Sequence, residues 1–301
     1  MFDLAVIGGG PAGLTAAIYG QRYGMRTVVL AGVVGGLVAD NPLIENYPGF
    51  RSITGADLSL AMQDHATSLG AEIKAENVVE VKKKGKTFTI KTESGTEVEA
   101  RTLVLAHGLK RRKLGARGED KFIGKGISYC ATCDGPFFKG KPVAVVGGGN
   151  SAALAALVLG EFASHVYVIY RREKFFRMQP YYLRKIEKVD KIEPLFKEEV
   201  AEFLGKEKIE KVKLEGGRVL DVSGVFIEIG FEPELPFKTD LKLTRDEKGF
   251  LKVDAGMRTS VPGVFAAGDI STGSDYFWQV ATAVGEGAIA ARSAYEHLLK
   301  E

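Results

Sequence analysis

The 301-residue sequence predicts an α/β protein with two similar parallel-sheet domains, the second inserted into the first. The main observation is an internal repeat, because residues 4–30 and 143–170 both read as apolar strand, glycine turn, helix and strand. A near-continuous apolar strand indicates a parallel sheet that is covered on both faces. The second observation is that residues 233–301 contain no third glycine turn and are too short for another sheet domain, so we expect them to complete the first.

Each repeat carries a glycine motif between its strand and its helix. Residues 8–13 read GGGPAG and residues 147–152 read GGGNSA. The glycines allow a tight turn and close approach to a pyrophosphate, whose charge meets the free N–H groups of the following helix. One such motif is a weak signal, but two in the same context predict two Rossmann-like dinucleotide-binding domains, each with three layers (ββα).

The remaining elements follow from alternation and turn residues. Alternating segments at about 78–105 and 196–229 each lead into a strand that ends in glycine, at Gly108 and Gly230. The stretch VPGVFAAGD, residues 261–269, reads as a strand that ends in Asp, and residues 279–299 read as a closing helix. The predicted domains are therefore residues 1–113 with 233–301, and the inserted residues 114–232.

Composition argues against several classes of partner. The net charge is only +3, from 41 basic and 38 acidic residues, which does not indicate a nucleic-acid or membrane-surface protein. The chain begins with MFD and passes directly into an apolar strand, without a basic segment or cleavage site of a signal peptide. We expect a cytoplasmic protein that binds neither nucleic acid nor membrane.

Both cysteines of the chain lie in YCATCDG, residues 129–135. A thiolate is a good nucleophile, and the CxxC spacing lets the second sulfur resolve a mixed disulfide made by the first. Structural zinc needs about four Cys or His ligands, and the four histidines of the chain are widely scattered. A structural disulfide across so short a loop constrains the unfolded chain little. A redox pair is the leading interpretation, with zinc and a structural disulfide as alternatives.

Two nucleotide motifs, a CATCDG string just ahead of the second, and the late GVFAAGD together resemble the low-molecular-weight thioredoxin reductases over essentially the whole chain. The resemblance implies FAD in the first domain, NADPH in the second, electron transfer through the cysteines to thioredoxin or a similar protein, and a homodimer. It implies that Cys133 lies against the flavin and that Cys130 attacks the partner's disulfide. Asp134 is placed to exchange the proton between thiol and thiolate.

The resemblance also implies the cofactor-binding residues. Those for FAD are Gly8, Gly10, Ala12 and Gly13 at the pyrophosphate, Asn46 and Gln279 toward the flavin ring and Asp269 at the ribityl chain, with Pro11, Gly36 and Val280 as further cofactor-binding residues. Those for NADPH are Gly147, Gly149, Asn150 and Ser151 at the phosphates, and Arg171, Arg172 and Arg177 for the 2′-phosphate.

Several positions depart from the family pattern. Arg177 stands one place later than the family's third arginine, so NADH, ferredoxin or a deazaflavin remains an alternative electron donor. Trp278 stands where an arginine is expected, and His107 replaces the usual threonine, where a local hydrogen bond is the leading interpretation. A flavin-binding redox sensor without catalysis is the alternative from another functional class.

The sequence order predicts a motion. Cys133 lies only 14 positions before Gly147, so the cysteine pair and the nicotinamide site share a domain while the flavin belongs to the other. Both must reach one flavin. We expect the inserted domain to swing about junctions near Lys113 and Glu232.

Overall fold

A computed structural model describes residues 1–300. The chain forms two compact units, one made of Met1–Lys110 and Pro233–Glu301, the other of Arg111–Glu232. We call them the discontinuous unit and the inserted unit. The α/β class with parallel sheets agrees with the prediction from the repeated strand–turn–helix pattern.

The discontinuous unit is built on a sheet with β1 near its centre. The parallel strands of this sheet are β1 (Phe2–Gly9), β2 (Thr27–Val34), β3 (Glu72–Lys74), β6 (Glu97–Leu105) and β18 (Val264–Ala266). The strands β4 (Val78–Lys84) and β5 (Thr87–Thr92) join β6 as antiparallel neighbours, and β17 (Lys238–Thr239) pairs with β4. Residues from both ends of the unit thus form one sheet, which explains how the late segment completes it.

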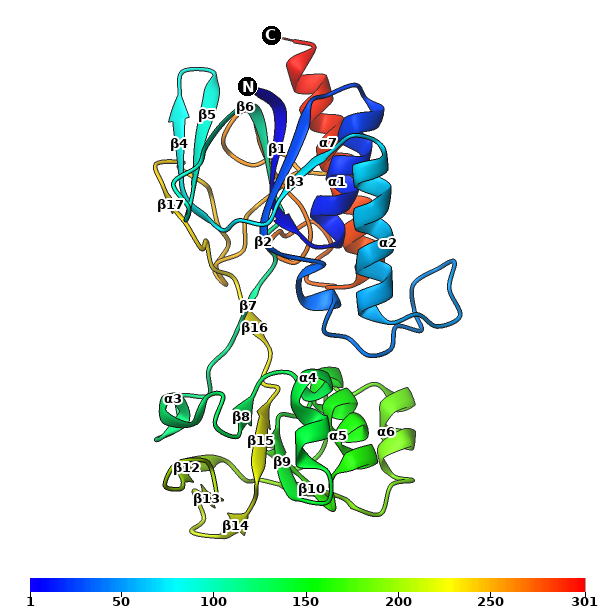
Figure 1. The fold of residues 1–301 in the computed structure, drawn as a ribbon, viewed down its shortest axis with the longest axis vertical. Coiled ribbons are helices and arrows are strands. Elements are labelled where there is room, and N and C mark those ends of the chain that lie inside the picture. Colours follow the sequence, from blue (N-terminus) through cyan, green and yellow to red (C-terminus); the bar gives the residue numbers. More distant parts are fainter. Residues whose placement is uncertain (301) are drawn as a thin grey trace. The chain divides into compact units, whose positions relative to one another are not determined.

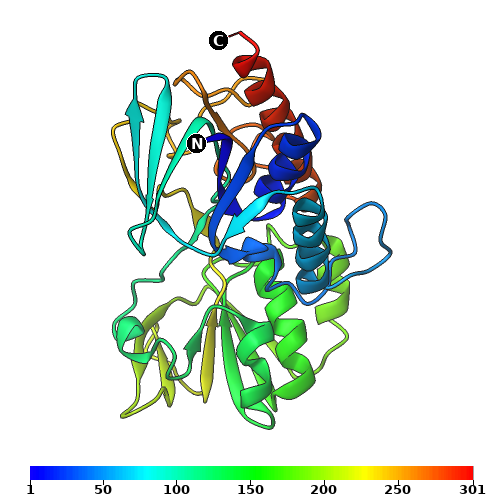
Figure 2. The same ribbon diagram turned by 45° about the horizontal axis from the view of Figure 1, so that its top comes forward.

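Three helices cover one face of this sheet, and the β4–β5 hairpin is the part of the sheet that lies away from them (Figures 1 and 2). They are α1 (Pro11–Arg22), α2 (Gly55–Ser68) and α7 (Val280–Leu298), and a short 3-10 turn, η1 (Gly36–Val38), follows β2. Small residues of α1 and α7 join one buried core with strand residues such as Leu4 and Val104. The close packing of these helices against the sheet holds the glycine turn in place.

The inserted unit repeats this plan with five parallel strands in the order β11-β10-β9-β15-β8. The strands are β8 (Ile127–Ser128), β9 (Pro142–Val146), β10 (His165–Tyr170), β11 (Ile192–Phe196) and β15 (Gly224–Ile227). The helices are α3 (Glu119–Phe122), α4 (Ala131–Asp134), α5 (Asn150–Phe162) and α6 (Pro180–Ile186), with the 3-10 turn η2 (Gly135–Phe138). A small antiparallel sheet adds β12 (Val200–Leu204), β13 (Lys211–Leu214) and β14 (Val219–Asp221).

Strand β9 shows that both faces of the second sheet are buried. Val143 and Val145 belong to the core shared with α5, whereas Ala144 and Val146 belong to the core shared with the antiparallel sheet. Successive side chains of a strand point to opposite faces, so an all-apolar strand is needed to fill two cores. Residues 142–160 carry no charged side chain, and the structure divides them between β9, the glycine turn and α5. No helix in the described part of the chain is long and apolar enough to span a membrane.

The two connecting segments run next to each other as a short ribbon of β7 (Lys110–Arg111) and β16 (Phe231–Glu232). The N–H of Arg112 donates to the carbonyl of Gly230 at 3.0 Å. The basic side chains of this region each have an acidic neighbour: Lys110–Glu234, Arg111–Glu228, Arg112–Glu232 and Lys113–Asp120. The basic cluster therefore belongs largely to a paired connection, and the pairs Arg112–Glu232 and Lys113–Asp120 are solvent-exposed.

We expect the contact between α7 and α1 to depend on a single glycine. A Cβ added at Gly287 would lie 2.2 Å from the carbonyl oxygen of Ala12. We therefore expect Gly287→Ala to lower the free energy of unfolding by about 1–3 kcal/mol in urea denaturation. Gly285 is the matched control, because it is exposed in the same helix and an added Cβ meets nothing within 4 Å. Gly285→Ala should raise stability by up to about 1 kcal/mol, and equal effects of the two changes would contradict this account.

Candidate functional site

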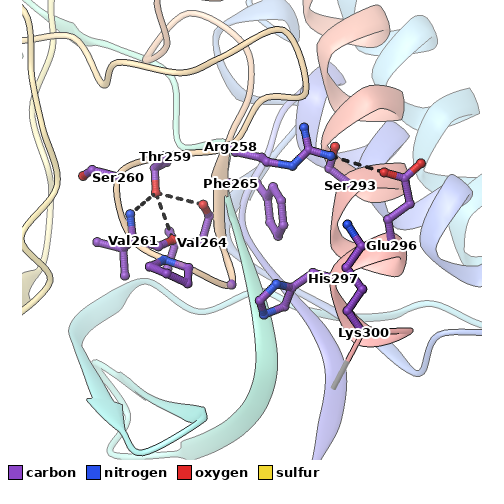
Figure 3. A pocket seen from close by; sticks show the side chains of 12 residues that line it. Arg258, Thr259, Ser260, Val261, Val264, Phe265, Ser293, Glu296, His297 and Lys300 are labelled. Atoms are coloured by element: carbon purple, nitrogen blue, oxygen red, sulfur yellow. Dashed lines mark hydrogen bonds and ion pairs between the residues drawn. The ribbon is translucent and has the colours of Figure 1, made fainter.

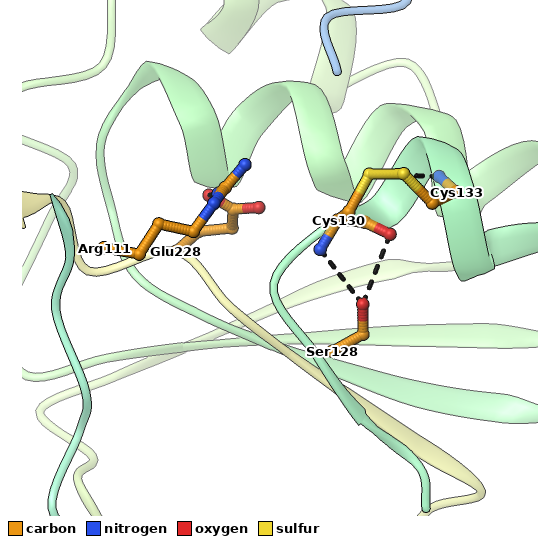
Figure 4. Close-up of a disulfide and its surroundings, with 5 residues drawn as sticks. All are labelled: Arg111, Ser128, Cys130, Cys133 and Glu228. Carbon is orange, nitrogen blue, oxygen red and sulfur yellow. Dashed lines mark hydrogen bonds and ion pairs between the residues drawn. A yellow bond between two sulfur atoms is a disulfide. The ribbon is translucent and has the colours of Figure 1, made fainter. Parts of the chain in front are cut away.

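The two cysteines form a disulfide at the start of α4 in the inserted unit (Figure 4). Ser128, at the end of β8, holds the first cysteine: its Oγ accepts the N–H of Cys130 at 3.0 Å and donates to the Cys130 carbonyl at 3.3 Å. The N–H of Cys133 donates to Cys130 Sγ at 3.2 Å. A hydrogen bond to sulfur favours the thiolate form once the disulfide is reduced, so this geometry favours Cys130 as a nucleophile.

The neighbourhood of the pair is partly open. Cys133 is exposed, whereas Cys130 and Asp134 are half-buried. The backbone N–H of Asp134 donates to the carbonyl of Cys130 at 3.1 Å. The Asp134 carboxylate makes no hydrogen bond or ion pair within residues 1–300. It is therefore able to exchange a proton with a neighbouring sulfur.

The first glycine turn lies at the carboxyl end of β1 in the discontinuous unit. Gly8 has φ of 114°, and a Cβ there would lie 2.3 Å from the carbonyl oxygen of Ala106, the residue directly after the returning strand β6. Pro11 opens α1, no acidic side chain stands in its first turn, and among residues 1–300 no side chain caps it. The free N–H groups at this helix start can therefore meet an anion.

Residues far apart in the sequence lie close together in this unit. A Cβ at Gly36 would lie 3.4 Å from the Cα of Gly10, so the loop after β2 passes directly over the turn. Asn46 Nδ2 donates to Gln279 Oε1 at 2.9 Å, although 233 positions separate them. Gln279 caps α7, whose first residue is Val280. The structure thus brings together the two amide side chains that the resemblance to the family places near one flavin ring.

Asp269 follows β18, a strand that pairs with β6. The preceding residue, Gly268, lies against Ala12 of the first glycine turn. Burial, and the nearby charge of Glu286, raise the pKa of Asp269 to about 6. No group of residues 1–300 donates a hydrogen bond to its carboxylate. A half-buried carboxylate without donors is suited to a ligand that brings hydroxyl groups.

The second glycine turn has the same construction in the inserted unit. Gly147 has φ of 146°, and a Cβ there would lie 2.1 Å from the carbonyl oxygen of Glu228, the residue directly after the returning strand β15. Gly149 precedes α5, which begins at Asn150 and Ser151 without an acidic residue in its first turn. Asn150 Oδ1 accepts the N–H of Gln179 at 2.8 Å, so part of its hydrogen bonding is already used within the protein.

Three arginines lie near this second turn. Arg177 forms a β-bridge with Gly149, so its late position in the sequence still places its backbone beside the turn. Arg171 and Arg172 follow β10 and are exposed, and the guanidinium of Arg172 lies 5.6 Å from the ring centre of Phe176. None of the three makes an ion pair within the described residues, so all are available to an anionic ligand.

Comparisons with known proteins identify the family. The sequence pattern described as "Pyridine nucleotide-disulphide oxidoreductase" matches residues 2–287. A thioredoxin reductase of Mycoplasma genitalium is 38% identical over 296 residues, covering 96% of this chain and 93% of the relative. Crystal structures of thioredoxin reductases from Lactococcus lactis (TM-score 0.93, 38% identity, all of both chains) and T. acidophilum (TM-score 0.92, 39% identity, 99% of both chains) have the same fold.

The chain belongs to the pyridine nucleotide-disulphide oxidoreductase family. Its fold is therefore that of the low-molecular-weight thioredoxin reductases, as the resemblance implied. It is an oxidoreductase with a redox-active disulfide, and the cofactors of this branch of the family are FAD and NADPH.

The residues of the discontinuous unit fit FAD. The glycine turn and the uncapped start of α1 suit a pyrophosphate, and Asp269 suits the hydroxyl groups of a ribityl chain. The indole Nε1 of Trp278 is buried without a hydrogen-bond partner among residues 1–300, which leaves one donor for a bound group or water. The inserted unit fits a dinucleotide through its own turn and the three unpaired guanidiniums.

Glu286 is a site residue that sequence reasoning missed. It is 5% exposed in α7, and its Oε2 accepts the N–H of Gly268 at 2.7 Å and the hydroxyl of Ser271 at 2.9 Å. These contacts hold the loop that carries Asp269. The one available signal was an acidic residue in a helix otherwise rich in alanine and glycine.

A separate cavity of about 270 Å³ lies beside the end of α7 (Figure 3). Its walls include Arg258, paired with Glu296 at 3.2 Å, and His297. None of the residues predicted to bind a cofactor lines this cavity, so we assign it no part in the reaction.

His107 is neutral in the folded protein at physiological pH. Its Nε2 bonds the carbonyl of Glu234 at 3.0 Å, and its Nδ1 is buried without a partner among residues 1–300. Burial lowers the pKa of His107 to about 4. The expected local hydrogen bond is confirmed for one ring nitrogen, and it joins the two chain segments that flank the connecting ribbon.

We expect His107 to make stability depend on pH. Its pKa is depressed on folding, so its stabilising contribution is full above the unfolded value of about 6.5 and is lost as pH falls toward about 4. Within that window the free energy of unfolding falls by up to about 1.4 kcal/mol for each pH unit. His107→Thr should lessen the fall in urea-denaturation free energy between pH 6.5 and 4, whereas the exposed His65→Gln should not. Parallel curves for all three proteins would contradict the assignment.

Proposed function

We propose that the chain reduces the disulfide of thioredoxin or of a thioredoxin- or glutaredoxin-like protein in the cytoplasm, with electrons from NADPH. The observation that carries this proposal is the Cys130–Cys133 disulfide on the domain that also holds the second nucleotide turn. The name of the relatives, thioredoxin reductase, supports thioredoxin as the partner.

We assign FAD to the discontinuous unit and NADPH to the inserted unit. The FAD residues are the glycine turn from Gly8 to Gly13, Gly36, Asn46, Asp269, Gln279 and Val280; those for NADPH are Gly147, Gly149, Asn150, Ser151, Arg171, Arg172 and Arg177. Bound FAD supplies the transfer of two electrons from NADPH to the disulfide.

The cysteines then act in turn. The Cys130 thiolate attacks one sulfur of the partner's disulfide, and the partner's other sulfur leaves as a thiolate. The Cys133 thiolate next attacks Cys130 Sγ, which releases the reduced partner and restores the Cys130–Cys133 bond. The half-buried Asp134 carboxylate takes and returns the proton of the Cys133 thiol.

Two further features belong to this proposal. The inserted unit swings about the β7–β16 ribbon, because one flavin must meet both the nicotinamide and the disulfide. Full turnover by a protein with a crosslinked ribbon would contradict this motion.

The chain forms a homodimer, supported by exposed apolar side chains such as Leu60 on α2 (56% exposed) and Ile289 on α7 (41%). A solution mass near 32.5 kDa, that of one chain, would exclude the dimer.

The test of the proposed function is anaerobic titration of the purified protein with NADPH. We expect flavin absorbance to bleach and a thioredoxin disulfide to be reduced. Cys130→Ser and Cys133→Ser should each abolish thioredoxin reduction, and Cys133→Ser should trap a mixed disulfide through Cys130 more efficiently than Cys130→Ser does through Cys133. Bleaching without reduction of any disulfide would favour the redox sensor, and trapping mainly through Cys133 would reverse the two cysteine roles.

The choice of electron donor is tested at the arginines. Arg171→Gln should raise the KM for NADPH about tenfold or more and leave the KM for NADH unchanged, because a charge-assisted hydrogen bond to the 2′-phosphate is lost. Arg184→Gln, an exposed change in α6 of the same unit, is the matched control. A wild-type protein that NADPH does not reduce would favour NADH, ferredoxin or a deazaflavin, each of which is then tried by stopped-flow mixing.

A further inference from the structure

A buried carboxylate lies next to the redox segment of the inserted unit. Glu119, the first residue of α3, is 3% exposed. Its neighbour Phe122 is 1% exposed and packs in the core that Ile127 and Phe203 also form. The helix is thus held by its apolar side, and the Glu119 carboxylate has a defined place in the domain.

Three donors surround this carboxylate. Oε1 accepts the N–H of Leu114 at 3.0 Å and the phenol O–H of Tyr129 at 2.6 Å, and Oε2 accepts the N–H of Gly115 at 2.6 Å. Glu119 has no ion pair with any residue from 1 to 300. A buried carboxyl group that makes no ion pair depends on its hydrogen bonds, so each of the three is worth more than an ordinary one.

Tyr129 stays protonated and can act as the donor throughout the physiological range. Burial, and then the hydrogen bond to Glu119, raise the pKa of its phenol above the ordinary value. Its ring packs against the same core as Phe122. The phenol of Tyr129 therefore links the end of β8, which it directly follows, to Glu119 at the start of α3.

The groups joined by Glu119 have different roles. Tyr129 immediately precedes Cys130, whose backbone is bonded on both sides to Ser128 Oγ. Leu114 and Gly115 follow the connecting segment at Arg111 and Arg112. The Glu119 side chain therefore links Leu114 and Gly115, where the chain enters the inserted unit, to Tyr129, the residue before Cys130.

We propose that Glu119 is a positioning residue for the redox pair, acting through Tyr129 to hold Cys130 in the geometry in which its sulfur accepts the N–H of Cys133. The inference rests on the proposed function, in which Cys130 is the attacking thiolate. When Tyr129 is released, the Cys130 backbone gains freedom and the 3.2 Å N–H···S contact weakens. The thiolate then loses stabilisation and the pKa of the Cys130 thiol rises.

The experiment measures Cys130 directly in the full-length protein. In a Cys133→Ser background Cys130 is the sole thiol, and its alkylation by iodoacetamide is followed against pH after reduction with dithiothreitol and its removal. Tyr129→Phe should move the midpoint to higher pH and slow alkylation at pH 7 about threefold or more, because the thiolate fraction falls. Tyr167→Phe is the matched control: it is half-buried, packs against the same core and makes no hydrogen bond to Glu119.

A second variant distinguishes a change in Cys130 reactivity from a general loss of stability. Glu119→Gln keeps the shape of the side chain but replaces one acceptor with a donor, so it should shift the midpoint in the same direction. A loss of stability alone would lower the melting temperature without moving the alkylation midpoint. Midpoints equal to those of the parent and of Tyr167→Phe would overturn the proposal.

This assay needs neither nicotinamide nor thioredoxin. A wild-type protein that fails to reduce thioredoxin would refute the proposed function while leaving the alkylation result to decide the role of Glu119. In turnover, Tyr129→Phe should lower kcat/KM for thioredoxin and leave the KM for NADPH unchanged, and an unchanged kcat/KM would also count against the proposal.

Discussion

Both domains depend on the same close approach between a glycine and a backbone carbonyl. At Gly8 the space for a Cβ is filled by the carbonyl of Ala106, and at Gly147 by that of Glu228. In each case the returning strand comes this close to the turn because it pairs directly with the first strand. The turn is thereby fixed against the sheet, and the helix start after it presents free N–H groups of the kind that suit a phosphate.

A buried carboxylate fixes loop segments in each of the two units. Glu286 holds the loop of Asp269 through an N–H and a hydroxyl, and Glu119 holds the segment before Cys130 through two N–H groups and a phenol. Gly268 and Ser271 flank Asp269, and Tyr129 immediately precedes Cys130, so in both cases at least one donor adjoins a residue of the proposed site. A buried acid that accepts several hydrogen bonds is costly to disturb, so it fixes loop geometry more firmly than an exposed ion pair does. Glu286 does so through Oε2 alone, because its Oε1 is buried without a hydrogen-bond partner among residues 1–300.

The side-chain contacts of the connection between the units, in contrast, are mainly exposed ion pairs. Its two strands are short, and ion pairs such as Arg112–Glu232 and Lys110–Glu234 are about half exposed. Exposed pairs contribute little stability each and re-form easily. A ribbon of this kind suits a joint, and the rigid contacts begin on either side of it, at His107 and at Glu119.

The sequence by itself determined the elements that repeat: the strand–turn–helix units at residues 4–30 and 143–170, the strand before Asp269, and the closing helix. These depend on local periodicity and on glycines next to one another in the chain, which are visible in one dimension. The compact units divide after Lys110, three residues before the predicted junction, and at Glu232. Only the tertiary structure could decide the contact of Asn46 with Gln279, the pairing of the basic connecting segment, and the places of Glu119 and Glu286. These involve polar side chains brought together by the fold from distant positions or from short loops, and such contacts leave no periodic signal in the sequence.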